Sequence, residues 1–291
     1  MSATATDAFV EHRNLLFTVA YEMLGSAVDA EDVLQETWLR WAEVDRSQVR
    51  DDRAYLVRIA TRLALNRMRS NARRREQYVG PWLPEPLLTT PDVAEDVELA
   101  DSVSLAMLTV LETLAPTERA VFVLREVFDL GYDEIAASVD KTPAAVRQIA
   151  HRSRAHVEER RPRREPSPTE HDRAMRGFLA AVSTGDIQSL MDVLAPDVVL
   201  ITDGGGVKKA ALRPILGRDK VIRFLDGVTG GVAADVDVVV VNGAPALRVV
   251  VDGELDTVAS MVVEDGQVTG LYVVRNPAKL ARLDAVVTLT R

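Results

Sequence analysis

Residues 132–157, YDEIAASVDKTPAAVRQIAHRSRAHV, predict two short helices joined by a tight turn. Apolar residues recur at helical spacing in both halves of this stretch. Between the halves, Asp140 and Lys141 form a polar turn, and Thr142 followed by Pro143 is typical of a helix start. A threonine side chain can accept a bond from the free amides of the first turn, and proline already has the required φ. The stretch therefore predicts a helix-turn-helix.

The second of these helices has an outer face suited to reading DNA. Its outward positions recur at spacings of three and four residues, and most of them are basic or carry an amide. They are Ala144, Arg147, Gln148, His151 and Arg154, with Arg152 beside them. Arginine can bond guanine and glutamine can bond adenine in the major groove, and each good pair contributes ~1–3 kcal/mol of discrimination. We therefore expect this face to bind DNA. The alternative is an ordinary helical hairpin with a solvated basic face.

The net charge of the chain, −9 with a pI near 5.1, is at first sight unfavourable for a nucleic-acid partner. The charge is unevenly distributed, however. Residues 50–80 contain nine arginines and three acids, and residues 141–164 contain eight basic and two acidic groups. Residues 81–110, between them, contain six acids and no lysine or arginine. Two separate basic segments can act as electrostatic footprints for nucleic acid, and the alternative is that both are solvated helix faces.

Composition and periodicity divide the chain into three domains. Helical periodicity dominates the first part, and two proline-rich segments interrupt it. From residue 235 onward, β-branched runs alternate with Asn-Gly and Asp-Gly pairs, which are typical of hairpins. We predict a multidomain chain in which two all-α domains, the second with the helix-turn-helix, precede an α+β domain with an antiparallel sheet. The predicted bounds are 1–80 and 95–160 for the helical domains, 81–94 for a linker, 161–170 for a hinge and 171–291 for the third domain.

The first proline-rich segment, PWLPEPLLTTP at 81–91, is unusual for a linker because it is apolar. Four large apolar side chains, those of Trp82, Leu83, Leu87 and Leu88, would each cost about 1.5–3 kcal/mol if left in water. We therefore expect this linker to dock on another surface of the protein.

Three longer motifs resemble those of the extracytoplasmic-function bacterial sigma factors. DAEDVLQETWLRW at 29–41 and RAYLVRIATRLALNRMRSNARRR at 53–75 are similar to region two of that family. Residues 114–157, which begin LAPTERAVFVLREVF and include the helix-turn-helix, are similar to region four. The resemblance implies a transcription-initiation factor whose partners are core RNA polymerase and promoter DNA.

The resemblance also implies roles for individual residues. Polymerase binding falls on Asp32, Gln35 and Glu36. Contact with the −10 promoter element falls on Asn66, Arg67, Arg69 and Arg73, and segment 42–52 matches the loop that captures a flipped −10 base. Contact with the −35 element falls on Arg147, Gln148, His151, Arg152 and Arg154.

The third domain resembles a SnoaL-like (NTF2-like) cone, in which helices and a curved antiparallel sheet surround a pocket. Sigma factors with this extension form the sigma-J type, and three motifs match it: WLPEPL at 82–87, DGGG at 203–206 and NPAKL at 276–280. The chain departs from the type where Val207 separates the glycines from a lysine and where Ala278 replaces an acid. The regulatory residues so implied are Trp82, Leu83, Pro84, Asp203, Gly204, Gly205 and Gly206.

We therefore expect a sigma factor that recognises −10 and −35 elements and whose fused third domain contacts the helical domains and modulates their activity. The alternative is a one-component helix-turn-helix regulator with a ligand-binding C-terminal domain. That regulator would have no need for the motifs at 29–41 and 53–75. An enzyme of the SnoaL-like class is disfavoured, because His171, Tyr272 and Asp203 are a poor acid–base set.

The composition narrows the remaining possibilities. The chain has no cysteine, which excludes disulfides and thiolate metal sites and suits a reducing compartment. The start of the sequence lacks the pattern of a signal peptide, and no apolar stretch has the length of a membrane span. We expect a cytoplasmic protein with no catalytic residues, no metal, no cofactor and no membrane contact.

Overall fold

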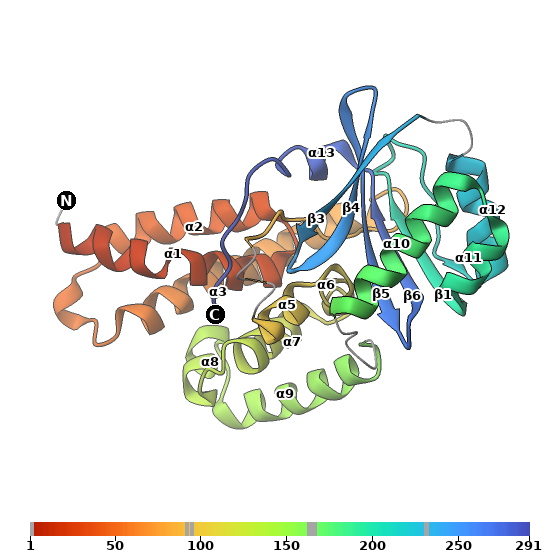
Figure 1. Ribbon diagram of the computed structural model, residues 1–291. Helices are drawn as coiled ribbons and strands as arrows, with labels where there is room; N and C mark the ends of the chain where they lie inside the picture. Colours follow the sequence, from red (N-terminus) through yellow and green to blue (C-terminus); the bar gives the residue numbers. More distant parts are fainter. Residues whose placement is uncertain (1–2, 91–92, 94–95, 162–167, 230–232) are drawn as a thin grey trace.

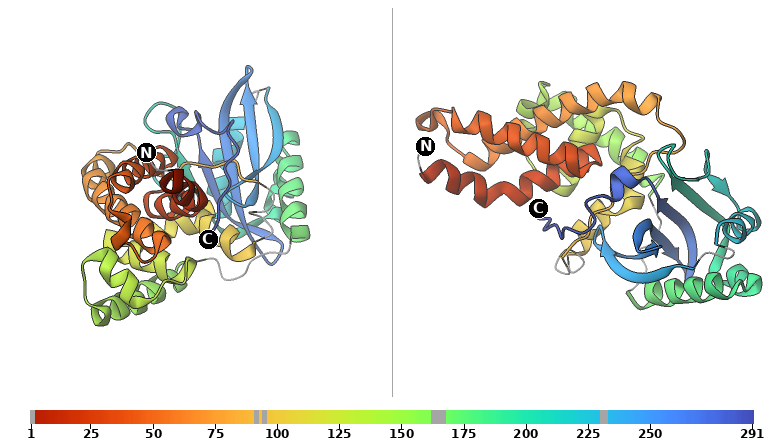
Figure 2. Two further views of the ribbon diagram at one scale, coloured as in Figure 1. Left: turned by 90° about the vertical axis from the view of Figure 1, so that its left-hand side faces the viewer. Right: turned by 90° about the horizontal axis from the view of Figure 1, so that it is seen from above.

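The computed structural model describes residues 3–90, 93, 96–161, 168–229 and 233–291. Helices make up the N-terminal half, and a six-stranded sheet with helices on one side follows (Figure 1). The two turned views show the helical part and the sheet part lying side by side (Figure 2). Most of the predicted hinge at 161–170 falls outside the described residues. The domain bounds given above stay predictions.

The first helical domain is a bundle of three helices that pack on one another. They are α1 (Ala3–Leu24), α2 (Ala27–Ala42) and α3 (Asp52–Glu76), with a short 3-10 turn at Arg46–Gln48. The side chains of Ser26 and Asp51 cap α2 and α3 by accepting bonds from backbone amides three residues further on. Trp41 is completely buried in the core.

The second helical domain contains the helix-turn-helix. Its elements are α5 (Val97–Val103), α6 (Leu105–Leu111), α7 (Pro116–Phe122), a π-helical turn (Val123–Val127), α8 (Tyr132–Val139) and α9 (Pro143–Glu158). The predicted helix-turn-helix is confirmed as α8 and α9. Asp140 ends α8 in the left-handed region, at a φ of 54°, and the Thr142 hydroxyl accepts a bond of 3.2 Å from the Ala145 amide.

The third domain is an α+β cone built on one sheet. Its helices are α10 (Pro168–Thr184), α11 (Ile187–Val193), α12 (Arg218–Thr229) and α13 (Pro277–Leu280). Its strands are β1 (Leu194–Asp203), β2 (Ile215–Leu216), β3 (Asp235–Val241), β4 (Ala244–Val251), β5 (Glu254–Glu264) and β6 (Gln267–Val274). The strand order is β2-β1-β6-β5-β4-β3. Each predicted hairpin turn is confirmed, because Asn242, Asp252 and Asp265 all have a φ of 50–53°.

The sheet differs from the prediction in one respect. β1 pairs with β6 in parallel, whereas the other neighbouring strands are antiparallel. β1 begins directly after α11, before the segment in which the sequence pattern predicted strands. β6 lies between β5 and β1, and the chain from β1 to β6 runs through β2, α12 and the three strands β3 to β5. Parallel neighbours require a long connection of this kind.

One hydrophobic core runs through both helical domains and includes two segments from outside them. Leu87 of the linker, 3% exposed, and Leu289 near the C-terminus, 2% exposed, are both part of it. The C-terminal tail leaves α13 and ends beside the helical domains (Figure 1). Its Thr290 amide donates to the Thr18 hydroxyl of α1 at 3.1 Å. With Leu83 fully buried in a separate core cluster, the predicted docking of the apolar linker is confirmed. Within the described residues, no helix is both long and apolar enough to span a bilayer.

Candidate nucleic-acid interface and the network behind it

The exposed face of α9 carries the basic residues that the sequence assigned to DNA. The side chains of Arg147, Gln148, His151 and Arg152 are exposed and line one shallow hollow of about 330 Å³. Arg154 is exposed too, but its guanidinium is held by Glu126 of the π-helical turn through two bonds of 3.0 and 2.6 Å. The structure therefore brings four of the five predicted −35 residues together around a single hollow.

A second hollow, of about 320 Å³, lies between the end of α2 and the start of α3. Its lining includes Glu43 and Val44 of the predicted base-capturing segment, together with Tyr55, Arg58 and Arg62 of α3. The guanidinium carbon of Arg58 is 4.8 Å from the centre of the Tyr55 ring. An aromatic ring with a cation beside it is a suitable platform for an unstacked base.

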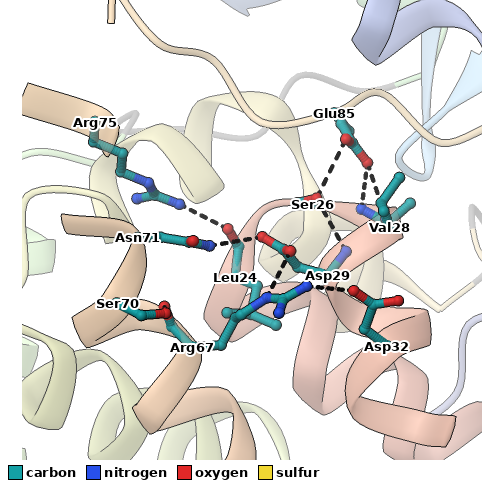
Figure 3. A network of polar contacts seen from close by, with 11 residues as sticks. Leu24, Ser26, Val28, Asp29, Asp32, Arg67, Ser70, Asn71, Arg75 and Glu85 are labelled. Carbon is teal, nitrogen blue, oxygen red and sulfur yellow. Dashed lines mark hydrogen bonds and ion pairs between the residues drawn. The ribbon is translucent and has the colours of Figure 1, made fainter. Parts of the chain in front are cut away.

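The predicted −10 and polymerase residues partly contact each other. Arg67 of α3 forms ion pairs with Asp29, at 2.8 Å, and with Asp32 of α2, while Asn71 donates to the other oxygen of Asp29 at 2.7 Å (Figure 3). Asp29 raises the pKa of Arg67 by accepting its hydrogen bond. The remaining residues of these two sets, Asn66, Arg69, Arg73, Gln35 and Glu36, are exposed. α3 is thus held against the acidic start of α2, with Asn66, Arg69 and Arg73 on its exposed side.

The linker caps the start of α2. The carboxylate of Glu85 accepts bonds from the Ser26 hydroxyl at 3.2 Å, from the Ala27 amide and from the Val28 amide at 3.3 Å (Figure 3). A carboxylate at a helix N-terminus is stabilised by the free amides and the helix dipole. Burial nevertheless raises the pKa of Glu85 above its ordinary value. The acid in WLPEPL therefore ties the linker to the first helical domain.

A buried carboxylate of the third domain holds the linker from the other side. Asp203 is 0% exposed and accepts bonds from the Tyr78 hydroxyl at 2.6 Å, the Leu83 amide at 2.8 Å and the Lys279 ammonium at 2.7 Å. Burial lowers the pKa of Lys279 to about 8, opposed by the charge of Asp203. The Lys279 ammonium also lies 3.8 Å from the centre of the Trp82 ring. The three motifs that pointed to the sigma-J type thus meet at one point in the structure.

The three glycines after Asp203 allow the chain to close tightly around this point. A Cβ on Gly204 would lie 2.2 Å from the Lys208 carbonyl oxygen, and one on Gly205 would lie 2.3 Å from the Asn276 side-chain nitrogen. Gly205 also has a φ of +61°. A larger residue at either position would therefore collide with its neighbours. Pro84 is buried beside Leu83.

One residue at the domain junction was missed by the sequence analysis. Asn242, in the turn between β3 and β4, accepts a bond from the Leu87 amide at 2.9 Å. Its side-chain nitrogen donates to the Tyr21 hydroxyl at 2.7 Å and to the Val103 carbonyl at 2.8 Å. It thus contacts α1, the linker and α5 at once. The only sequence signal was Asn-Gly, which predicts a hairpin and carries no information about what the turn contacts.

A buried carboxyl group lies where the two helical domains meet, and it too was missed. Glu22 of α1 accepts a bond from the Ser102 hydroxyl of α5 at 2.9 Å, and its other carboxylate oxygen has no hydrogen-bond partner among the described residues. Arg119 of α7, 1% exposed, donates to the Glu22 carbonyl at 2.8 Å and pairs with Glu112. Burial raises the pKa of Glu22 to about 8, partly opposed by Ser102 and Arg119. This carboxyl is therefore largely protonated at neutral pH.

Replacing Glu22 by Gln is expected to flatten the pH dependence of stability between about pH 5 and 8. The folded protein holds a proton on Glu22 in this range, whereas the unfolded chain releases it near the ordinary pKa of 4.5. Glu22 should therefore make the free energy of unfolding of the unmodified chain fall as the pH rises, by up to ~1.4 kcal/mol per pH unit, and the variant should lack this contribution. Urea unfolding at several pH values measures this slope. The exposed Glu254→Gln is the control, and an unchanged slope in E22Q would contradict a protonated carboxyl.

The arginine-rich helix α3 of the first helical domain touches the helix-turn-helix of the second. Arg62 of α3 donates to the carboxylate of Asp140 at 2.6 Å and to the carbonyl of Ala137 at 2.9 Å, both at the end of α8. Arg62 also lines the hollow beside Tyr55. The two basic surfaces are therefore held close together in this arrangement.

A helix-turn-helix with an exposed basic face, a second arginine-rich helix beside a hollow, and a fused α+β cone are the parts of a modular transcription protein. The chain belongs to the extracytoplasmic-function RNA polymerase sigma factors, as comparison with known proteins shows. Residues 8–74 match the model of Sigma-70 region 2, and residues 104–157 match that of Sigma-70, region 4.

Two curated relatives and one solved structure are similar over nearly the whole chain. The ECF RNA polymerase sigma factor SigJ of Mycobacterium tuberculosis is 34% identical, over 96% of this chain and 93% of its own length. The probable ECF sigma factor SigI of the same species is 33% identical, over 96% and 95%. A crystal structure of M. tuberculosis SigJ has a TM-score of 0.76 at 32% identity and covers 95% of this chain and 98% of its own. Because that match covers nearly the whole of both chains, it includes the third domain.

Proposed function

We propose that the two exposed basic surfaces divide promoter recognition between them. α9 reads the −35 element through Arg147, Gln148, His151 and Arg152, with Arg154 at its edge. α3 and the hollow beside Tyr55 take the −10 element through Asn66, Arg67, Arg69 and Arg73, and Asp32, Gln35 and Glu36 bind core RNA polymerase. The observation that carries this proposal is the gathering of four predicted −35 side chains around one exposed hollow on α9.

We propose that the third domain modulates this activity by holding the helical domains together. The −35 and −10 elements are nominally about 25 base pairs apart, or ~85 Å at 3.4 Å per pair. In contrast, α3 and α8 are in direct contact through Arg62. The two helical domains would therefore have to separate from this arrangement before α3 and α9 could contact both promoter elements at once. The bonds of Asp203 and Asn242 to the linker support a role for the third domain in setting that balance.

The family implies that the protein acts in the cytoplasm. The test of its function is transcription in vitro with core RNA polymerase. The full chain is compared with residues 1–164, and strand opening is followed by the reactivity of unpaired thymines. Open complexes that form only with polymerase and this chain together support the proposal. Specific duplex binding without polymerase, and no opening with it, would instead support the one-component regulator. In this role the chain carries out no reaction of its own.

Replacing Arg147 by Ala is expected to lower discrimination among −35 sequences by about 5- to 150-fold, because one good base contact contributes ~1–3 kcal/mol. The measurement is run-off transcription on promoters that each differ at one −35 base pair. Arg173→Ala, on the exposed side of α10, is the matched control and should leave the profile unchanged. An Arg147→Ala profile equal to that of the unmodified chain would remove α9 from −35 recognition.

A further inference from the structure

The ring of Tyr132 lies beneath one of the predicted base-reading arginines. Tyr132 is the first residue of α8, and its half-buried side chain packs against the helical core. The guanidinium carbon of Arg147 lies 5.3 Å from the centre of the Tyr132 ring, and that of Arg125 lies 5.0 Å from it. Both distances are within the range of a cation–π contact.

The ring is held in place by the loop that precedes it. The Leu130 amide donates to the Leu124 carbonyl at 3.0 Å, closing the loop after the π-helical turn. The Gly131 amide donates to the Glu134 carboxylate at 3.0 Å, which caps α8. Arg125 is itself anchored, by an ion pair of 2.9 Å with Asp129 and a bond of 2.9 Å to the Leu130 carbonyl. Tyr132 is therefore a rigid surface for any side chain that rests on it.

The kind of contact matters for an arginine that reads a base. Arg154, at the other end of the same face, is held by the Glu126 carboxylate, which accepts bonds from two of its nitrogens. Arg147, in contrast, has no acid or carbonyl acceptor among the described residues, and its guanidinium lies over the ring of Tyr132. An aromatic face attracts a guanidinium through the ring quadrupole and accepts no conventional hydrogen bond from its edge. The five N–H donors of Arg147 thus stay available for a base.

We propose that Tyr132 is a positioning residue for −35 recognition: its ring holds the Arg147 guanidinium in a reading orientation while leaving its hydrogen-bond donors free. A free arginine side chain must lose much rotamer freedom when it binds, and restricting it beforehand reduces that cost. This inference rests on the proposed reading of the −35 element by α9. It adds a residue from the first helix of the helix-turn-helix to the determinants of specificity.

The experiment is a double-mutant cycle on the full chain with core RNA polymerase. Tyr132→Leu, Tyr132→Phe, Arg147→Ala and the double variant Tyr132→Leu/Arg147→Ala are assayed by run-off transcription on the set of −35 promoters. Tyr132→Leu is expected to lower discrimination about two- to fivefold, the range of an exposed cation–π contact, at the base pair most affected by Arg147→Ala. Tyr132→Phe keeps the ring and should keep the profile. The double variant should be no worse than Arg147→Ala alone.

A purely structural role for Tyr132 gives a different result. Loss of packing alone would lower activity equally on every −35 sequence and on a parallel set of −10 variants, and it would add to the effect of Arg147→Ala. Either outcome overturns the inference, as does a Tyr132→Phe profile that matches Tyr132→Leu. An unchanged profile in Arg147→Ala is distinguishable from these, because it refutes the proposed −35 reading itself. Thermal unfolding of each variant shows that the proteins compared are folded.

Discussion

Replacing Asp203 by Ala is expected to lower the free energy of unfolding by about 3–5 kcal/mol and to release the linker from the third domain. The substitution removes the acceptor for the Tyr78 hydroxyl, the Leu83 amide and the Lys279 ammonium in a site that is 0% exposed. Lys279 would then be a buried cation without its counter-ion. Removing one member of such a pair costs far more than the intact pair contributes, because the other charge stays desolvated.

The measurement combines urea unfolding with limited proteolysis of the linker. The double variant Asp203→Ala/Lys279→Met removes both charges and is the matched control. Since it leaves no unpaired ion, it should recover much of the lost stability. If Asp203→Ala were as stable and as protease-resistant as the unmodified chain, the buried network would not hold the linker. If the double variant were less stable than the single one, the unpaired lysine would not be the cause.

Replacing Asn242 by Ala is expected to lower the free energy of unfolding by about 3 kcal/mol and to increase exchange of the Leu87 amide with solvent. The substitution leaves the Leu87 amide and the Val103 carbonyl without partners at a buried junction, at about 1–3 kcal/mol for each orphaned group. The Tyr21 hydroxyl keeps one bond, to the Glu85 carbonyl at 2.6 Å.

Asp252→Ala is the matched control for this variant. Asp252 occupies the equivalent turn between β4 and β5 with the same φ of 53° as Asn242, but it is exposed. Both substitutions place an alanine in the left-handed region, so the backbone cost is shared, and the difference in stability reports the junction contacts alone. Hydrogen exchange followed by mass spectrometry gives the Leu87 readout. Equal stability of the two variants would show that Asn242 acts only as a turn residue.

How far the sequence could predict this structure depended on whether a signal was local. The helix-turn-helix is a matter of neighbouring residues, and Thr142 and Pro143 begin α9 where their capping chemistry predicts. The apolar linker could be expected to dock because burial was its only favourable option. The partners of the linker could not be predicted in this way. Asp203 and Leu83 are 120 residues apart, and nothing in either motif specifies that they bond.

The burial of these charged groups could not be predicted from the sequence for a related reason. Glu22 and Arg119 lie on helices where a polar residue ordinarily marks the solvent side, so helical periodicity gives no reason to expect either to be buried. They are buried because α1 and α7 pack on each other, and this contact between domains has no counterpart in helical periodicity. The parallel pairing of β1 with β6 could not be predicted either, because it depends on where the long connection between them returns and not on the residues of either strand.

The contacts that Lys279 and Leu289 make with the linker and the helical domains have a consequence for the protein during its synthesis. Both residues belong to the last 13 of 291, yet they complete the site around Asp203 and the core of the helical domains. At about 5–20 residues per second, a ribosome needs roughly 7–26 s to add the 131 residues that follow the helix-turn-helix domain. During that time the two helical domains have left the ribosome or are leaving it without their C-terminal partner. Each newly synthesised molecule thus passes through a stage in which Lys279 and Leu289 do not yet hold the helical domains.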